Sequence, residues 1–312
     1  MTEEQRRCKE HFLEPETRDG YFVDANMKAS WKVLLDILEE FMRVAGKYNL
    51  KWSMEGGSLL GAIRHKGFIP WDDDIDVVMP RKDYDKLIDI LPGELPSHLF
   101  AQTTRSASDF HIPHLMICDS RTTGIDISHV KWKKHFNMGM RIDVLPLDGM
   151  PCAPIRFFVR KYISFIMNGV PHNPADWPRK SLSAKVKYRI GRLLFLLFGN
   201  KGLYTLRELP LRMLPMGRYE WCGSLCARNF WHPHSIRKTE WFREYKSVPF
   251  EYIDVNVPVD AERILAQQFG DWRKPVKGTS FHGGLILDPH TSYKKVLVER
   301  FGYAPEPLAK LP

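Results

Sequence analysis

Four aspartates directly before a short apolar run restrict what this chain can fold into. In WDDDIDVVMP (71–80) the acids are Asp72, Asp73, Asp74 and Asp76. Alternate residues of a β-strand point to the same face, so Asp74 and Asp76 would share one face of a strand start. Two carboxylates on one face repel each other unless a cation lies between them, and hard divalent cations such as Mg²⁺ bind oxygen ligands of this type. The segment therefore predicts a strand that begins at a metal site.

A glycine-rich turn lies upstream of these acids, in EGGSLLGAIRHKG (55–67). It predicts a short helix over 58–67 that opens at Gly57 and Ser58 and ends at Gly67. Glycine lets the backbone approach a ligand closely, and unpaired amide groups at a helix N-terminus bind anionic phosphates. One element can thus hold phosphates while the next holds the metal that neutralises them, which is the arrangement of phosphoryl-transfer sites.

A third carboxylate usually completes such a site, and RIDVLPLDG (141–149) offers two. We choose Asp143, which lies on an apolar strand, over Asp148, which falls in a predicted turn at 146–149. An EF-hand calcium loop built on the aspartate cluster is excluded, because Val77 stands at the position that requires Gly. An acidic pair alone is common on protein surfaces. Its combination with the glycine turn and a later strand aspartate is far more specific.

Helical and strand patterns alternate along the chain and predict an α/β fold of the α+β type, with a mixed sheet flanked by helices. The expected helices are 26–50, 58–67, 81–92 and 261–272, and the expected strands are 51–55, 75–80, 115–120, 138–149 and 250–260. Asn26 is the expected N-cap of the first helix, and the last helix should face inward with Ile264, Leu265 and Phe269. We divide the chain into an N-terminal extension (1–25), a catalytic core (26–150), a basic, mainly helical insert (151–245) and a C-terminal part of the catalytic domain (246–312).

The formal charge of +9 is unevenly distributed along the chain. Residues 151–250 contain 18 Lys or Arg and 5 Asp or Glu, a net charge of +13, so the remainder is acidic. The segments 156–170 and 179–199 mix these cations with bulky apolar residues. This composition suits an anionic membrane surface, an anionic polymer or nucleic acid, and it equally suits a basic outer face over a packed helical core.

The cysteines and the N-terminus indicate a reducing compartment. Five sparsely spread cysteines favour free thiols over a disulfide framework. Cys222 and Cys226, followed by His232 and His234, have a non-standard spacing for zinc, and we favour buried thiols beside a surface turn. The N-terminal segment lacks the apolar core of a signal peptide and no apolar run is long enough to span a bilayer, so we expect a cytoplasmic protein.

The segment GGSLLGAIRHKGFIPWDDDIDVVMPRKDYDKL resembles the defining block of the LicD family, which contains the phosphorylcholine transferases and is related to fukutin and the fukutin-related protein. RIDVLPLDG resembles the second block of the family, and FEYIDVNVPVDAERILAQQFGDW resembles its C-terminal block. The resemblance covers residues 28–150 and 248–290. It departs from the family in RKPVKGTSFHGG, where Pro-Pro is common, and in the insert 151–245, which has no family pattern.

The resemblance implies a nucleotidyltransferase-like fold and the transfer of choline phosphate or an alditol phosphate from a CDP-linked donor to a cell-surface glycan or its lipid-linked precursor. It implies Mg²⁺ or Mn²⁺ as the cofactor and no nucleic-acid partner, and it places the enzyme at the inner face of the membrane if the acceptor is lipid-linked. The implied catalytic and metal-binding residues are Asp74, Asp76 and Asp143. The expected donor-binding residues are Gly57, Ser58, Arg64, His65, Lys66, Trp71 and His282, although Trp71 equally suits a core or lid position and His282 a plain loop position.

Two other classes of function stay open. A glycosyltransferase also uses Asp-x-Asp to hold a nucleotide sugar, but such enzymes place a longer α/β region before the acidic pair than the helix and short strand found here. A non-catalytic glycan- or membrane-binding protein would tolerate the loss of an acid, yet all three candidate acids are present. The metal-dependent phosphotransferase is therefore the favoured hypothesis.

Overall fold

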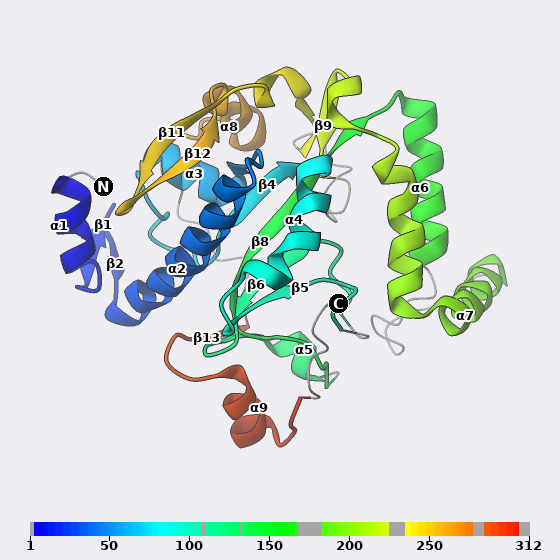
Figure 1. Ribbon diagram of the computed structural model, residues 1–312, viewed down its shortest axis with the longest axis horizontal. Coiled ribbons are helices and arrows are strands. Elements are labelled where there is room, and N and C mark those ends of the chain that lie inside the picture. The colour runs from blue at the N-terminus through cyan, green and yellow to red at the C-terminus, as the bar shows by residue number, and fades with distance from the viewer. Residues whose placement is uncertain are drawn as a thin grey trace.

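The computed structural model describes residues 3–107, 110–131, 133–167, 182–224, 235–276 and 284–305. Its central element is the long strand β8 (Met140–Met150), which pairs in parallel with β4 (Asp76–Pro80). The strands β6 (Leu115–Asp119) and β9 (Trp221–Gly223) pair antiparallel with the first and last parts of β8. The sheet is completed by β3 (Ser53–Met54) beside β4, β5 (Leu99–Gln102) beside β6, and β10 (Arg237–Lys238) beside β9 (Figure 1). The predicted mixed α/β sheet is confirmed.

The first predicted helix is α2 (Ala25–Lys47), which lies along β8. Its sheet-facing side carries buried residues spaced three or four apart, as expected for an amphipathic helix: Trp31, Leu34, Leu35, Leu38, Phe41 and Val44. The N-cap prediction of Asn26 is wrong, because the Asp24 carboxylate accepts a hydrogen bond from the Met27 amide at 2.8 Å and Asn26 already lies inside the helix.

Two further helices follow strands of the sheet directly. β3 runs into α3 (Gly56–Arg64), and β4 runs into α4 (Arg81–Glu94) at Pro80. Pro92 lies inside the last turn of α4 instead of ending it as predicted. These strand-to-helix junctions bring the start of α3 and the start of β4 close together, because β3 and β4 are antiparallel neighbours.

The C-terminal part returns to the same core. The hairpin of β11 (Tyr245–Phe250) and β12 (Ile253–Pro258) leads into α8 (Ala261–Phe269). The buried face of α8 contains Ile264 and Leu265, as predicted, but Phe269 is 46% exposed. Phe269 is the last residue of the helix before Gly270, so its side chain lies beyond the packed turns.

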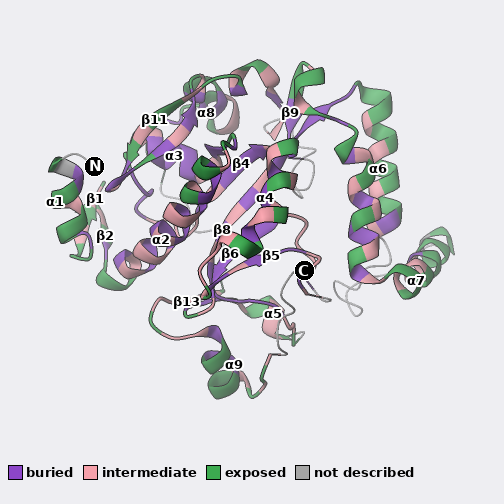
Figure 2. Cartoon of the chain, in the orientation of Figure 1, coloured by how far each residue is buried: buried purple, intermediate pink, exposed green. Residues whose placement is uncertain are grey.

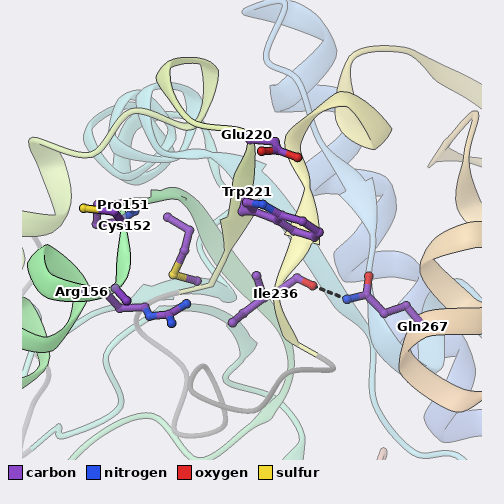
Figure 3. A pocket seen from close by; sticks show the side chains of 9 residues that line it. Pro151, Cys152, Arg156, Glu220, Trp221, Ile236 and Gln267 are labelled. Atoms are coloured by element: carbon purple, nitrogen blue, oxygen red, sulfur yellow. Dashed lines mark hydrogen bonds between the residues drawn. The ribbon is translucent and has the colours of Figure 1, made fainter.

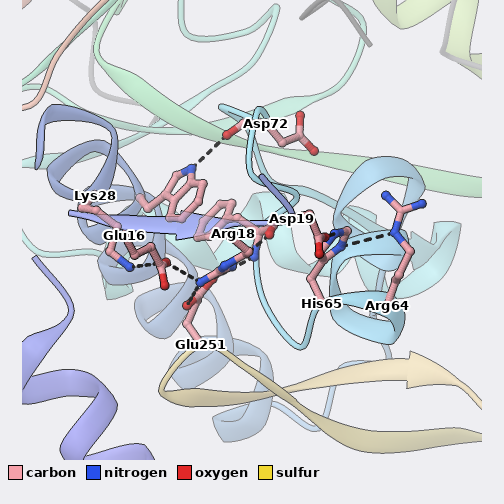
Figure 4. A network of polar contacts seen from close by, with 10 residues as sticks. Glu16, Arg18, Asp19, Lys28, Arg64, His65, Asp72 and Glu251 are labelled. Atoms are coloured by element: carbon pink, nitrogen blue, oxygen red, sulfur yellow. Dashed lines mark hydrogen bonds and ion pairs between the residues drawn. The ribbon is translucent and has the colours of Figure 1, made fainter. Parts of the chain in front are cut away.

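The N-terminal extension packs against this hairpin. It forms α1 (Glu3–His11), β1 (Glu16–Arg18) and β2 (Tyr21–Val23). The Arg18 guanidinium donates hydrogen bonds to both carboxylate oxygens of Glu251, at 2.7 and 3.1 Å, and Glu251 lies at the hairpin turn (Figure 4). Residues 3–23 are therefore joined to the core by a half-buried ion pair.

A second, smaller core lies on the other face of β6. β7 (Thr123–Asp126) pairs with β13 (Leu285–Asp288), and α5 (Ile127–Lys131) and α9 (Tyr293–Phe301) adjoin them. Met116 and Cys118 of β6 face this small core, whereas Leu115 and Ile117 face the main core. This alternation is the period-two pattern of a strand buried on both faces.

Within its described residues the insert contains the helices α6 (Ala153–Met167) and α7 (Leu182–Arg212), and α7 is broken at Gly199. It also supplies β9 and β10 to the central sheet, so the region 151–245 is more than a helical insert. The predicted turn at 146–149 is wrong, because β8 continues through Pro146 while β4 and then β9 extend its pairing. Across the described residues, no helix combines the length and the apolar character that a bilayer crossing requires.

Candidate active site

Parallel pairing of β4 with β8 brings the predicted acids together. Asp76 lies directly opposite Asp143 in the register, and the Asp143 amide donates to the Ile75 carbonyl at 2.9 Å. Paired residues on adjacent strands point to the same face of a sheet. Asp74 stands two residues before Asp76, in the segment that leads into β4, and Ile75 between them is fully buried in the core.

The three acids act on one another electrostatically. Burial raises the pKa of Asp76 well above its usual range, and the negative charges of Asp74 and then Asp143 raise it further. His114 acts in the opposite direction, and Glu55 adds to the increase. Such a pKa is expected where carboxylates crowd together without an equal number of cations. The site therefore has a deficit of positive charge.

A small cavity lies beside Asp74 and Asp143, and Asp76 is not part of its wall. It has a volume of about 30 Å³, and Asp73, Asp74, Asp143 and Arg141 contribute polar groups to its wall. A cavity of this size has room for a water molecule, and the carboxylates and the guanidinium in its otherwise apolar wall offer polar partners. The side chains of Asp72, Asp73 and Asp74 each offer an oxygen within 4.8 Å of the other two, and no other acidic, histidine or cysteine trio among the described residues meets that limit. This trio shares Asp74 with the predicted metal set.

The glycine turn of α3 contacts the same acids. A Cβ atom at Gly57 would lie 2.7 Å from Asp72 Oδ2, so the absence of a side chain leaves room for that carboxylate. The Ser58 hydroxyl accepts a hydrogen bond from the Asp76 amide at 2.9 Å, and Ser58 is buried. Ser58 therefore positions the start of β4. The Trp31 indole donates to the Asp72 carbonyl at 2.8 Å and fixes the preceding loop (Figure 4).

Glu55 is a site residue that the sequence reasoning missed. It directly precedes α3, and its amide donates to the Asp76 carbonyl at 3.0 Å. One carboxylate oxygen pairs with the buried Arg237 and accepts from Gln268 at 3.2 Å. The other, Oε2, is buried without a hydrogen-bond partner among the described residues. In the sequence, the position of Glu55 directly before Gly-Gly-Ser could have indicated a role at the site. Only the fold shows that Glu55 lies beside Asp76.

Two basic residues next to Asp143 were also missed. His114 Nε2 lies 3.6 Å from Asp143 Oδ1, and Arg141 Nε lies 3.9 Å from the same oxygen. Arg141 stands two residues before Asp143 on β8, so strand alternation already placed both on one face. His114 precedes β6, and nothing local in the sequence connects it to Asp143. Arg141 adds a positive charge to a site that otherwise gathers acids, and His114 adds one when its imidazole is protonated.

The predicted basic donor-binding residues lie at the opposite end of α3 from the glycine turn. The Arg64 guanidinium donates to the Trp272 carbonyl at 2.7 Å, and His65 Nε2 lies 2.7 Å from Asp19 Oδ2 (Figure 4). The Lys66 carbonyl accepts from the Glu251 amide at 2.7 Å. Eight residue steps of helix, about 12 Å of rise, separate Gly56 from Arg64. These contacts tie α3 to its neighbours, and donor contact by Arg64, His65 and Lys66 stays a prediction.

The buried His65 gives the protein a testable pH dependence. Burial, and then the adjacent Arg64, lower the pKa of His65 below its ordinary value. The unfolded chain therefore binds more protons than the folded protein near the ordinary His pKa of about 6.5, so stability should fall as pH drops through that region. In urea unfolding at about pH 7.5 and about pH 5.5, His65→Gln should lose less stability on acidification than the wild type. An equal loss in both proteins would contradict this assignment.

The remaining predicted residues divide into two groups. Trp71 packs against the main core and makes an edge contact with Tyr21, with ring centroids 5.9 Å apart, which agrees with the core or lid interpretation. His282 lies outside the described residues, as do Cys226, His232 and His234 of the possible zinc group. Cys222 is a buried free thiol.

A second cavity, of about 510 Å³, lies at the far end of β8 (Figure 3). Its walls include Met150, Trp221, Ile236, Arg156 and Gln267, and the Gln267 amide donates to the Ile236 carbonyl at 2.5 Å. Seven residue steps along β8, roughly 23 Å of strand, separate Asp143 from Met150. This cavity is therefore distinct from the acidic site.

Comparison with known proteins shows what this chain is similar to. Residues 49–149 match the model of the LicD/FKTN/FKRP nucleotidyltransferase domain. The lipopolysaccharide cholinephosphotransferase LicD of Haemophilus influenzae is 29% identical over 244 residues, which cover 78% of this chain and 89% of that protein. Uncharacterized proteins of Rickettsia prowazekii and Rickettsia typhi are 41% and 39% identical over 59 residues, about a fifth of each chain.

The matched domain contains α3, β4 and most of β8, and with them every acid of the cluster. The similarity to the Haemophilus influenzae protein extends well beyond that domain. Taken together, these findings show that residues 49–149 match the LicD-type nucleotidyltransferase domain and that the similarity to a LicD protein covers most of the chain.

Proposed function

We propose that this chain is a metal-dependent phosphotransferase that moves choline phosphate or an alditol phosphate from a CDP-linked donor to lipopolysaccharide, a related cell-surface glycan or its lipid-linked precursor. The observation that carries the proposal is the register of β4 and β8, which places Asp76 opposite Asp143 beside Asp74. The enzyme class follows from the LicD-type domain and from the relative of Haemophilus influenzae, whose name describes a cholinephosphotransferase acting on lipopolysaccharide. The donor and the metal are our inference.

The residues present suit a hard divalent cation. The oxygens of Asp72, Asp73 and Asp74 within 4.8 Å of one another, the raised pKa of Asp76 and a buried Glu55 oxygen without a hydrogen-bond partner among the described residues all favour a positive charge near Asp74 and Asp76. We propose that Asp74, Asp76 and Asp143 hold Mg²⁺ or Mn²⁺, with Asp72 and Asp73 nearby. When bound, such an ion neutralises the charge that develops on the transferred phosphoryl group.

The other groups of the site have roles that follow from their positions. Backbone amides of the glycine turn at Gly57 are suited to the donor phosphates, because α3 begins there. Arg141 supplies a cation on the same face as Asp143. In the proposed reaction, an acceptor hydroxyl oxygen bonds to the phosphorus that carries the alcohol, and the phosphorus–oxygen bond to CMP breaks. The acceptor proton would pass to Asp143, whose charge is balanced by His114 and Arg141.

Gly57→Val tests the glycine turn. The new Cβ would lie 2.7 Å from Asp72 Oδ2, so the Asp72 carboxylate must move and the backbone can no longer approach a phosphate closely. We expect at least about a tenfold loss of affinity for the CDP-linked donor, with little change in far-UV circular dichroism. Gly46→Val on α2, where a Cβ meets nothing within 4 Å, is the matched control. Unchanged donor affinity in calorimetry would remove this turn from the site.

The function itself is tested by ligand and product analysis. Purified protein with Mg²⁺ would be screened by thermal shift against CDP-choline, CDP-ribitol, CDP-glycerol and nucleotide sugars, because ligands that bind the folded state raise the melting temperature. The donors that bind would then be incubated with lipopolysaccharide and the products analysed by mass spectrometry. Transfer of a phospho-alcohol supports the proposal. Transfer of a sugar would indicate a glycosyltransferase, and no binding of any donor would contradict both enzyme functions.

A further inference from the structure

The first part of α7 exposes a continuous apolar stripe. Leu182, Val186, Ile190, Leu193 and Leu197 recur at helical spacing, and their exposed fractions run from 40% for Ile190 to 79% for Leu182. At 100° per residue these five side chains lie within one narrow sector of the helix. A stripe of this length on the surface of a globular protein marks an interaction site.

Helix α6 has a comparable stripe. Ile155, Phe158, Tyr162 and Phe165 recur at helical spacing and are 36% to 69% exposed. Ile166, at one edge of this stripe, packs against Leu203 and Tyr204 of the second part of α7, and the Tyr162 hydroxyl donates a hydrogen bond to the Leu206 carbonyl at 2.9 Å. The stripe of α6 therefore borders its packing face, and its residues stay 36% or more exposed beside that contact. Figure 2 shows both helices with exposed residues along their outer sides, away from the central sheet.

Cations border both stripes, and no acid does. The residues 153–167 and 182–198 include seven Lys or Arg and contain no Asp or Glu. On α7, Lys185, Arg189 and Arg192 follow one edge of the stripe and Lys187 follows the other, as the helical period requires. An apolar face with a basic border is the composition of helices that lie in the interface of an anionic bilayer.

A cavity between the two helices gathers three of these cations. It has a volume of about 400 Å³ and is lined by Arg160, Lys161, Ser164 and Lys187 together with Phe157 and Phe165. The Lys161 ammonium lies over the Phe157 ring, 5.2 Å from its centroid. Basic groups beside apolar side chains suit a lipid phosphate whose acyl chains lie against the neighbouring surface.

We propose that α6 and residues 182–198 of α7 form a bilayer-docking surface, and that the cavity between them receives the phosphate of an anionic lipid headgroup. Association of two copies through this surface is disfavoured, because a two-fold interface would bring its cations against each other. The occupant must instead carry negative charge and apolar chains together, as an anionic phospholipid does. The inference stands on this surface alone and does not depend on the phosphotransfer proposed above.

The surface is connected to the catalytic sheet. α6 begins at Ala153, three residues after the end of β8, and β8 carries Asp143 (Figure 1). A protein docked through α6 and α7 would therefore hold its acidic site at a constant distance from the bilayer. This arrangement suits an acceptor that is itself anchored in lipid.

Co-sedimentation of the full chain with vesicles tests the proposal. We expect binding to vesicles of phosphatidylcholine with phosphatidylglycerol, weaker binding to phosphatidylcholine alone, and a decrease with added salt. Lys161→Glu/Lys187→Glu should lower partitioning at least about 25-fold, since each cation near an anionic surface contributes about a fivefold effect. Val186→Ser/Leu193→Ser should lower it at every salt concentration, because the apolar contribution is not screened.

Matched controls are available at exposed positions elsewhere. Lys82→Glu/Lys246→Glu makes the same charge change as the lysine variant at two exposed positions. Val259→Ser/Val298→Ser removes two exposed apolar side chains, as the stripe variant does. Both controls should bind vesicles like the wild type. Asp74→Asn should also bind normally, so a failure of the proposed chemistry is distinguishable from a failure of docking. The proposal is overturned if wild-type protein does not bind anionic vesicles, if it binds heparin but not vesicles, or if the stripe and control variants bind equally.

Discussion

Asp76→Asn is expected to abolish transfer activity while the protein remains folded, and Asp74→Asn is expected to do the same. Each change removes a carboxylate from the strand start that would hold the metal, and the ion's stabilisation of the transition state is lost with it. We expect a decrease in turnover of at least about a thousandfold. Initial rates with CDP-choline and lipopolysaccharide, measured across a Mg²⁺ titration, would give this value.

The folded state should tolerate the Asp76 substitution well. Burial and the charges of Asp74 and Asp143 raise the pKa of Asp76, so the folded protein without metal binds more protons than the unfolded chain above the ordinary Asp pKa of about 3.9. Its stability should therefore fall as pH rises from that value through the raised pKa, and Asp76→Asn removes this loss. Asp254→Asn, at an exposed position on β12, is the control. Near-wild-type turnover of Asp76→Asn at saturating Mg²⁺ would refute the metal site.

Arg81→Met is expected to destabilise the fold by about 3–5 kcal/mol, because it leaves a buried carboxylate without its partner. Arg81 donates two hydrogen bonds of 2.7 Å to the carboxylate oxygens of Asp148, and both side chains are buried. Burial raises the pKa of Asp148 to about 6, although Arg81 lowers it. Chemical denaturation at about pH 7.5 should therefore show a larger loss than at about pH 5, where Asp148 is protonated more easily.

The double variant Arg81→Met/Asp148→Leu separates a lost ion pair from a lost packing contact. Replacing both partners of a buried pair with apolar residues of similar size is often close to neutral, so most of the lost stability should return. Arg81→Lys should be intermediate, because an ammonium group cannot reproduce the two parallel hydrogen bonds. A loss below about 1 kcal/mol in Arg81→Met would contradict the importance of this ion pair, because Arg81 is also the partner of Glu208, at 3.7 Å, and of Asp85.

Asp148 also shows where local interpretation of the sequence fails. The letters PLDG are typical of a turn, and they predicted a turn at 146–149. In the structure, β4 pairs with Pro146 and Leu147 and β9 pairs with Asp148, so the strand continues to Met150. Tertiary pairing outweighed the local turn preference. Asp148 thereby became a buried structural acid, and the choice of Asp143 for the active site stays consistent with the fold.

The sequence by itself determined the elements whose signals are local. The period-two alternation around Ile75 and the helical spacing in α2 depend only on neighbours along the chain, so the acidic strand start and the flanking helices were predictable. The same holds for the short helix after the glycine turn. The LicD resemblance rested on these segments and was confirmed by the domain match.

Only the tertiary structure decided which groups meet at the site. Asp76 and Asp143 are 67 positions apart in the sequence and became neighbours through the register of β4 against β8. The same folding brought His114 to Asp143 and Glu55 to Arg237. It also placed His65 beside Asp19, and Arg64 beside the Trp272 carbonyl. Such contacts depend on sheet order and helix packing between distant segments, which no local periodicity specifies.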